Sequence, residues 1–467
     1  MRRNDRSVRL RHLCWLVALL AASCSGVARG GAGSAPAGRV GPDSGVQAGS
    51  APAGPVGPRP GIQAGPGPAC AGHALTPASN VQAAINRARP GSTFCFRPGT
   101  YYVSALIPKS GDVLDGDGLA AVLDGRNSAA YAIYGDSTSR GPSDVTIRGF
   151  VIRNFDNPLQ SGAIQDFNGP GWIIEDNHIT HNAAAGVATG DKVKVLYNLI
   201  DWNAQEGFGA HGYGGLYEGN VIAYNNFNLA IDPFWEAGGG KAFATNDLTF
   251  ESNYVHDNGG NGIWADTNNI NTTFDHNLVS NNRGAGISDE ISYDATITNN
   301  IVTGNAMPSA PGKSIDQGWG WDAGIQLRAS GGTSSSSPLI IAHNIVTDNF
   351  NGITLIQSPT PNSCADPGDG LYGPCRIRNI IVEDNYITMS QGTTGEMQDG
   401  TVDSIFTSWN NRWLDNHYCV VSAVHPNDGY SYGWFAWENR NVSWSAWQGY
   451  GLDKNGTFQV GGTCKPS

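Results

Sequence analysis

Two carboxylates recur at one register of the chain, in two segments that repeat after 24 residues. Between GNGIWADTNN and GAGISDEIS, Ile263 aligns with Ile287 and Asp266 aligns with Glu290. A repeat of this length is typical of a solenoid, in which each repeat forms one coil and equivalent residues stack. Because stacked strands lie about 4.8 Å apart, Asp266 and Glu290 are expected to be direct neighbours. Two such groups repel, so one is held protonated or a cation lies between them, which is typical of an active site or a metal site.

Neighbouring repeats extend the two carboxylates into a column of polar residues. Aligning the repeats on a turn Asn or on a Gly-Ile pair gives the predicted order Asp166, a small residue near Gly190, His211, Asp232, Asp266, Glu290, Arg328 and Gln357. Residues two apart in a strand share a face. The flanking row is therefore Trp264, Ser288 and Gln326, and the residues that point into the core are Ile263, Ile287 and Ile325. A face of mixed polar residues is often only solvated, but acids, bases and an aromatic ring in successive coils favour a functional cleft.

Two insertions beside this column add further candidates. The segment PFWEAGGGKAFATND lengthens one coil and carries Trp235, Glu236 and Lys241. Long insertions at one edge of a solenoid often build its binding site, although Glu236 and Lys241 also fit a simple surface pair. A second insertion supplies a wall with Trp, a residue that commonly stacks on sugar rings. The residues expected to bind substrate are Trp264, Trp235, Glu236, His211, Gln326 and Trp321.

Asn residues mark the corners of the repeats, each between two short β-branched segments. They are Asn177, Asn198, Asn220, Asn253, Asn277, Asn300, Asn344 and Asn385. Their spacing gives a basic repeat of about 22 residues, and the longer gaps hold inserted loops. Asn tolerates the left-handed backbone of a tight corner, so a stack of Asn is expected there.

Together with the opening VQAAINRARPGSTFCFRPGTYYV, these repeats resemble the right-handed parallel β-helix proteins of the pectate-lyase-like superfamily, secreted bacterial type, over about residues 73–407. The resemblance implies an all-β fold, a single-stranded parallel β-helix with a short N-terminal helical cap. The Trp-rich tail resembles the closing segment of such proteins. We expect its Trp residues to cover the last coil, and the alternative is a sugar platform made by one or two of them.

The chain divides into four parts by composition. Residues 1–24 read as an export signal with a charged start and a short apolar core. The run LAASC leaves two interpretations open, a lipidated Cys24 or ordinary cleavage after a small residue. Residues 25–69 are a Gly/Pro/Ala-rich flexible linker. The β-helix domain is expected over 70–407 and the capping segment over 408–467. We expect an exported monomer, extracellular or at the cell surface, that contacts a membrane only through a lipid on Cys24.

Charge and cysteine content narrow the partners and the compartment. The formal net charge is -12, which makes nucleic acid a poor partner. Neutral or cationic sugars and divalent cations fit better, and a polyanionic substrate needs a local basic patch. Six Cys remain after the signal, an even number that predicts disulfides in an exported protein. Proximity in sequence pairs them as Cys70–Cys95, Cys364–Cys375 and Cys419–Cys464.

The resemblance implies polysaccharide chemistry, and the residues fit two mechanisms that remain open. In a hydrolase, one carboxylic acid protonates the leaving oxygen and a second carboxylate attacks or activates water. Asp266 with Glu290, in adjacent coils about 5 Å apart, is the retaining option. Asp232 with Glu290, two coils or about 9.6 Å apart, is closer to the inverting one. Arg328 holds the ionised partner charged.

In a lyase or epimerase, the sugar is a uronate whose carboxylate must be neutralised. Asp232, Asp266 and Glu290 are the expected oxygen ligands of a Ca²⁺ ion, and Lys241 or Arg328 is the expected base. Calcium is the one cofactor that the sequence suggests. The non-enzymatic alternative is a surface-tethered β-helix that binds glycan or is purely structural, which the linker and the lipidation signal also fit.

Overall fold

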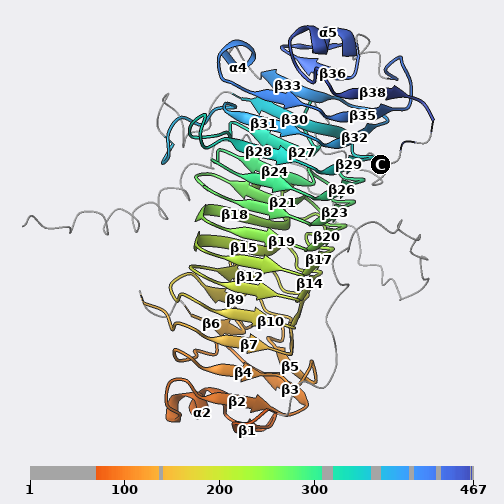
Figure 1. Ribbon diagram of the computed structural model, residues 1–467. Helices are drawn as coiled ribbons and strands as arrows, with labels where there is room; N and C mark the ends of the chain where they lie inside the picture. Colours follow the sequence, from red (N-terminus) through yellow and green to blue (C-terminus); the bar gives the residue numbers. More distant parts are fainter. Residues whose placement is uncertain are drawn as a thin grey trace, which may run out of the picture. The chain divides into compact units, whose positions relative to one another are not determined.

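Three long parallel sheets, wound around one core, make up the described part of the chain. The computed structural model describes residues 70–135, 140–307, 319–358, 370–398, 404–426, 433–462 and 464. The expected export signal, the linker and Cys364 lie outside the described residues. Figure 1 shows the coils stacked in chain order, from β1 and β2 (orange) to β38 (blue). The expected all-β parallel β-helix is confirmed.

Sheet A follows the first wall of the coils, and its strands are parallel to one another. In stacking order they are β1 (His73–Leu75), β2 (Thr93–Phe96), β4 (Val113–Asp115), β7 (Thr146–Arg148), β10 (Ile173–Glu175), β13 (Lys194–Leu196), β16 (Leu216–Glu218), β19 (Thr249–Glu251), β22 (Thr273–Asp275), β25 (Thr296–Thr298), β28 (Leu339–Ala342), β31 (Ile380–Glu383) and β34 (Arg412–Leu414).

Sheet B comes next in each coil and is also parallel. Its strands are β3 (Gly99–Tyr102), β5 (Ala121–Asp124), β8 (Phe150–Arg153), β11 (His178–Thr180), β14 (Leu199–Asp201), β17 (Val221–Ala223), β20 (Tyr254–His256), β23 (Leu278–Ser280), β26 (Ile301–Thr303), β29 (Ile345–Thr347), β32 (Tyr386–Met389), β35 (His417–Val420) and β38 (Thr457–Val460). Strands β34, β35 and β38 continue sheets A and B beyond Thr407, so the tail first completes a coil and then covers it.

Sheet C closes each coil and has longer strands than sheets A and B in the middle of the molecule. They are β6 (Ile133–Tyr134), β9 (Gly162–Asp166), β12 (Ala185–Thr189), β15 (Glu206–Tyr213), β18 (Gly238–Asn246), β21 (Asn261–Asp266), β24 (Ile287–Glu290), β27 (Ala323–Arg328), β30 (Asn351–Gln357), β33 (Thr394–Gln398), β36 (Phe435–Trp437) and β37 (Arg440–Val442). The last pairing, β36 with β37, is antiparallel and ends the parallel register.

Buried Asn side chains hold the corners, as the sequence predicts. Between sheets A and B, each Asn of the ladder donates its backbone N–H and its side-chain amide to the Asn of the next coil. Asn253 does so to Asn277 Oδ1, with both distances 3.0 Å. Asn277 in turn donates to Asn300 Oδ1 at 3.0 Å and to the carbonyl of Phe250 at 2.9 Å. A second ladder at the corner between sheets B and C repeats the pattern, for example from Asn258 to Asn282.

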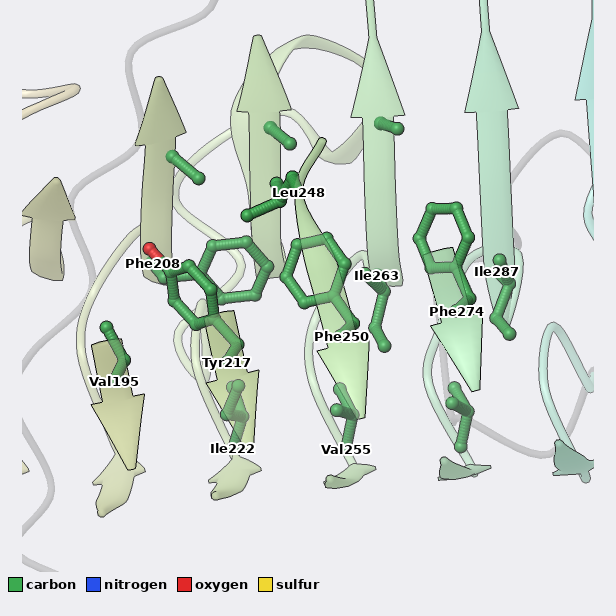
Figure 2. Close-up of a cluster of buried hydrophobic side chains, with 14 of the residues drawn as sticks. Val195, Phe208, Tyr217, Ile222, Leu248, Phe250, Val255, Ile263, Phe274 and Ile287 are labelled. Carbon is green, nitrogen blue, oxygen red and sulfur yellow. The ribbon is translucent and has the colours of Figure 1, made fainter. Parts of the chain in front are cut away.

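Apolar side chains from all three sheets fill the space inside the coils. In the middle coils, Phe208 of sheet C and Tyr217, Phe250 and Phe274 of sheet A pack next to one another (Figure 2). Phe250 and Phe274 stack with ring centroids 5.5 Å apart. Such a continuous core supplies the burial that no single coil can supply alone.

Both ends of the core are covered. Helix α2 (Val81–Arg87) begins at Asn80, whose side chain accepts a hydrogen bond from the N–H of Ala83, and it buries Val81 and Ile85. At the other end, α5 (Trp444–Gly449) follows the hairpin of β36 and β37, and two shorter helices are α3 (Pro233–Glu236) and α4 (Ser404–Thr407).

The Trp residues of the tail pack against the core. Trp413, Trp434, Trp437 and Trp447 are buried, and Trp409 and Trp444 are partly buried. Their burial supports a cap rather than a sugar platform.

Two disulfides reinforce the ends of the fold. Cys70 is bonded to Cys95 and Cys419 to Cys464, as predicted. Cys364, the predicted partner of Cys375, lies outside the described residues. Disulfides are compatible with an exported protein. Among the helices of the described residues, none has the length and apolar character needed to cross a membrane.

Candidate active site

Asp266 and Glu290 are register partners on β21 and β24, as the repeat predicts. Continuing across sheet C, Phe243 pairs with Asp266, and Glu290 pairs with Arg328. We call this outward row the outer column. The flanking row Trp264, Ser288 and Gln326 and the core row Ile263, Ile287 and Ile325 also follow the predicted register.

Each carboxylate of the pair has its own cation. Lys241 Nζ lies 2.7 Å from Asp266 Oδ2 and 3.2 Å from Glu236 Oε1. Arg328 donates to Glu290 Oε1 through Nη1, and its Nε donates to Ser358 Oγ at 3.0 Å. The cations therefore come from the coils on either side, and the two acids face each other between them.

Aromatic rings support both cations. Lys241 Nζ lies 4.3 Å from the ring centroid of Trp264, and Arg328 Cζ lies 5.1 Å from that of Trp321. Trp264 is buried, whereas Trp235 is 41% exposed and its carbonyl oxygen accepts from Lys241 Nζ at 3.3 Å. A ring face attracts a cation and also fixes the direction of a long side chain. The rings thus hold the positive groups over the carboxylates.

The environment makes the two acids unequal. Burial, and then the negative charge of Asp266, raise the pKa of Glu290 to about 7, against the lowering effect of Arg328 and Lys241. The Glu290 side chain is 9% exposed and that of Asp266 is 14% exposed. With a pKa near neutrality, Glu290 is suited to give and take a proton beside Asp266, which is paired with the Lys241 ammonium group.

Lys241 stays protonated in this arrangement. Burial alone lowers the pKa of a lysine, but the charges of Asp266 and Glu236 outweigh that effect and raise the pKa of Lys241 above its usual value. Lys241 therefore acts as a fixed positive charge between two carboxylates and is a poor proton acceptor.

Two further buried acids, one beside Glu236 and Lys241 and one beside Asp266 and Glu290, were not predicted from the sequence. Glu206, at the start of β15, is fully buried; burial and the charge of Glu236 raise its pKa well above the usual value. The repeat contains a signal for Glu206. When Gly207 is aligned with Gly262, Glu206 lies directly before the aligned Gly of its coil. Asp289, between the partners Ala265 and Leu327, has a pKa raised to about 7 by burial, with the charges of Asp266 and Glu290 adding to it.

A row of rings continues the outer column beyond Asp266, and only one of its members was predicted. His211 lies at the register irregularity between Ala210 and Gly212. Its ring is 6.1 Å from Phe243 on one side and 6.1 Å from Phe167 on the other. Phe167 and Phe243 carry no charge and were therefore missed by a search for acids and bases.

Three residues predicted for the column lie elsewhere. The repeat alignment that predicted Asp166 places Ala163 in the core row. In the structure, Ile164 pairs with Val187 and therefore belongs to the core row instead. Asp166 therefore belongs to the row of Thr189 and is buried. For Gln357, the turn after Asn349 is one residue shorter than the turn after Asn258, so Ile356 is the partner of Arg328. Gln357 instead accepts from the N–H of Ile377 at 2.8 Å.

Asp232 does not reach the outer column either. It is exposed and precedes α3, and its carbonyl oxygen accepts from the N–H of Trp235 at 3.1 Å. The sheet strand of this coil begins only at Gly238, so the insertion gives the place beside Asp266 to Phe243. In the described part of the chain, no group of three or more His, Cys, Asp or Glu side chains is arranged to hold a metal ion.

The remaining predicted residues surround the pair. Glu236 is held by Gln160, whose side chain donates to its carboxylate, and by Gln205, which donates to its carbonyl oxygen at 3.0 Å. Gln326 is buried, and its Oε1 accepts from the N–H of Asp322 at 2.8 Å. Hydrogen bonds thus fix Glu236 and Gln326, whereas the buried Ser288 hydroxyl of the flanking row has no hydrogen-bond partner among the described residues.

Comparisons with known proteins agree with the fold. Residues 161–335 match the family described as "Right handed beta helix region". No curated protein sequence matches the chain. The Azotobacter vinelandii mannuronan C-5 epimerase AlgE6 A-module is similar in structure, with a TM-score of 0.53 and 18% identity, covering 83% of this chain and 95% of that one. The right-handed parallel β-helix architecture is confirmed.

Two other solved structures share the fold at lower identity. The catalytic unit of the GH87 alpha-1,3-glucanase from Streptomyces thermodiastaticus strain HF3-3 has a TM-score of 0.52 and 13% identity, covering 87% of this chain and 72% of that one. XylC in complex with xylose has a TM-score of 0.50 and 11% identity, covering 73% and 80%. At these identities the likeness establishes the fold alone.

Proposed function

We propose that this protein is a polysaccharide-cleaving glycosidase, with Glu290 as the acid and base and Asp266 as the nucleophile. The observation that carries the proposal is the unequal pair in adjacent coils, a Glu290 with a pKa of about 7 beside an Asp266 ion-paired to Lys241. The names of the similar structures, an epimerase acting on mannuronan, an alpha-1,3-glucanase and a xylose complex, support a carbohydrate as substrate.

The spacing of the pair fits the retaining reaction. Register partners in adjacent parallel strands lie about 4.8 Å apart, near the separation of about 5 to 5.5 Å between the carboxyl groups of retaining enzymes. In the first step, an Asp266 oxygen forms a bond to the anomeric carbon as the bond to the leaving oxygen breaks, and Glu290 gives that oxygen its proton. In the second step, the Glu290 carboxylate takes a proton from water, whose oxygen attacks the anomeric carbon and releases Asp266.

The two cations, Lys241 and Arg328, are better suited to hydrolysis than to abstraction of a proton from the sugar. A lyase or epimerase needs a base at the C5 proton of a uronate, but Lys241 is held protonated by two carboxylates. Arg328 is engaged by Glu290 and Ser358, and a guanidinium is not deprotonated in proteins. The cations instead suit two carboxylates of the reaction: Lys241 pairs with Asp266, the proposed nucleophile, and Arg328 pairs with the Glu290 carboxylate that forms once its proton has been given up. No step of the proposed reaction requires the predicted calcium ion.

The outer face of sheet C has open space at one position beyond Lys241. The flanking row continues with Gly209, where an added side-chain carbon would meet only Glu206 Oε1, at 3.8 Å, and then with Ala188, which is buried. Phe167, His211 and Phe243 lie beside this stretch and offer ring faces and edges. Aromatic rings beside such an opening are suited to a sugar unit.

We also propose that the protein works outside the cytoplasm as a monomer, with residues 1–24 directing export. The two disulfides support export. Intact mass of the mature protein from the native host distinguishes a lipidated Cys24 from a freely secreted chain, because only the former carries acyl groups.

The test is incubation of the purified protein with bacterial and plant polysaccharides, with and without calcium. New reducing ends and absorbance near 235 nm are read together in the wild type and in Glu290→Gln. We expect reducing ends without the absorbance of unsaturated products, and their loss in the variant. Reducing ends with that absorbance contradict the hydrolase. Silence on every polymer, combined with glycan binding that Glu290→Gln retains, supports the non-catalytic binding protein instead.

A further inference from the structure

A second row of aromatic rings lies away from the acid pair, at the corner between sheets B and C. His181, Trp202 and Tyr224 directly follow β11, β14 and β17, so they occupy one register in three successive coils. Trp202 stacks on Tyr224 with centroids 4.8 Å apart and an angle of 16° between the planes. Phe227 meets Trp202 edge-on at 5.6 Å. Trp202 is 38% exposed and Phe227 46%, so these large rings are only partly used in packing.

A groove of about 280 Å³ runs beside this row. Trp202, His181 and Phe227 contribute rings to its lining, and Ala183 and Ala204 line it with methyl groups. Asn127, Asn154 and Asp156 add amides and a carboxylate. We call it the corner groove. Flat apolar faces next to a few hydrogen-bonding groups are the combination that small polar ligands with an apolar face require.

We propose that the corner groove binds one or two neutral sugar units of a glycan, as a second site separate from Asp266 and Glu290. The C–H face of a pyranose packs on Trp202 or Phe227, and its hydroxyls exchange hydrogen bonds with the exposed side chains of Asn127 and Asp156. The charge of the lining selects the class of sugar. In the described part of the chain, this lining includes Asp156 and no Lys or Arg, which disfavours a uronate.

The position of the groove relates it to the acid pair. Trp202 lies in the coil of β15, which stacks on β18 and then on β21, the strand of Asp266. Two coils correspond to about 10 Å along the stack, and Asp266 lies at the far end of β21, about 17 Å across sheet C from the first residue of that strand. A chain held at the groove is therefore kept near sheet C, and its local concentration there rises. This inference rests on the proposed function only for the identity of the polymer, because stacking on the rings needs no catalysis.

Substitutions are expected to have different effects if the row of rings is purely structural than if it forms a binding site. Stacked rings at a solenoid corner stabilise the coil whether or not a ligand is bound, and Trp202→Ala removes both roles at once. Ala183→Leu separates them, because it fills the groove and leaves every ring in place. Tyr197→Ala is the matched control, since Tyr197 is 42% exposed in the same coil and is not part of the groove lining.

The experiment is affinity electrophoresis of the full chain in gels that contain soluble mixed-linkage β-glucan, arabinoxylan or alginate. All variants are made in the Glu290→Gln background, so that cleavage does not alter the gel. We expect retardation by a neutral polymer, with the apparent Kd raised about fivefold or more by Trp202→Ala and Ala183→Leu and unchanged within twofold by Tyr197→Ala. Thermal unfolding verifies the fold of each variant.

Three results overturn the proposed groove: no retardation by either neutral polymer, unchanged retardation in Ala183→Leu, or tighter binding to alginate than to the neutral polymers. Failure of the proposed hydrolase is seen separately, because it appears as absent reducing ends in the wild type and leaves these binding shifts in place. If both hold, Trp202→Ala lowers cleavage of long chains and not of short oligosaccharides.

Discussion

The Asn ladder between sheets A and B and the outer column of sheet C both place one residue per coil on top of another. In the ladder the residue is the same at every level, and each amide bonds to the next, as from Asn253 to Asn277. In the outer column it changes from Phe243 to Asp266, Glu290 and Arg328. Repetition satisfies buried donors and holds the coils in register. Variation places different charged side chains about 4.8 Å apart. Such contacts shift the pKa values of acids and suit them to catalysis.

The largest expected effect concerns the varied column. Glu290→Gln removes the proton donor and keeps the size of the side chain, so kcat/KM on the polysaccharide is expected to fall about 10³-fold, or about 4 kcal/mol. Because burial raises the pKa of Glu290 as it does that of Asp289, the free energy of unfolding should also change with pH, so the rates are compared per folded molecule. Glu251→Gln, an exposed acid on sheet A, is the matched control and should keep full activity. Wild-type rates in Glu290→Gln would show that the column is only a charged surface.

The repeated ladder should respond in the opposite way. Asn277→Ala leaves two donors of Asn253 and the carbonyl of Phe250 without partners, so the free energy of unfolding is expected to fall by about 3 kcal/mol. Urea unfolding measures this loss. Activity per folded molecule should remain, and Asn86→Ala on the exposed side of α2 should cost less than about 0.5 kcal/mol. Equal losses for the two Asn variants would contradict a structural ladder.

Asp289 sharpens the comparison, because it is an acid in an inward row. Its pKa is about 7 when folded and near 3.8 when unfolded, so its contribution to stability is greatest below about pH 4 and is lost as the pH rises through 7. Asp289→Asn removes this pH-dependent contribution to stability. Relative to the wild type, the variant should gain about 2 to 3 kcal/mol between pH 5 and pH 9, measured by urea unfolding at both pH values. A constant difference between the two proteins would show that Asp289 does not titrate in this range.

The smallest expected effect concerns the pH profile. Lys241 lowers the pKa of Glu290, so Lys241→Gln should move the basic limb of kcat/KM from near pH 7 to a higher pH. The rate at the optimum should fall about tenfold, because the charge of Asp266 is no longer balanced. Lys194→Gln, an exposed lysine of sheet A, is the control. A basic limb that moves to lower pH would place the acid elsewhere.

The sequence was sufficient for the fold because its repeats fix the register directly. The Asn markers predicted a ladder that the structure contains, and the Gly-Ile pairs at 262–263 and 286–287 placed Asp266 beside Glu290. The residue before each core Ile is small because a side chain there would meet the next coil: at Gly262 it would meet the carbonyl oxygen of Gly286 at 2.5 Å. Periodicity of this kind arises from packing and is therefore visible without a structure.

The site was only partly predictable, because insertions and turn lengths break the periodicity. The turn after Asn349 is one residue short, which moved Gln357 out of the column, and the insertion before Gly238 left Asp232 on an exposed turn. The same insertion brings Glu236 to Lys241, a contact that depends on the path of α3 rather than on a repeat. In the corner groove, Trp202 occupies a repeat position, directly before Asn203 as His181 is before Asn182, whereas Phe227 lies outside that repeat position and meets Trp202 from the adjacent coil.

The most direct test of the central claim is the anomeric configuration of the newly released sugar end, followed by proton NMR from the first minutes of cleavage. Acid and nucleophile in adjacent coils predict retention, because Asp266 must be displaced by water in a second step. Product of retained configuration, together with its absence in Glu290→Gln, is the result that this account predicts. Product of inverted configuration would contradict the Asp266–Glu290 pair and would require two carboxylates farther apart, with a water molecule between them.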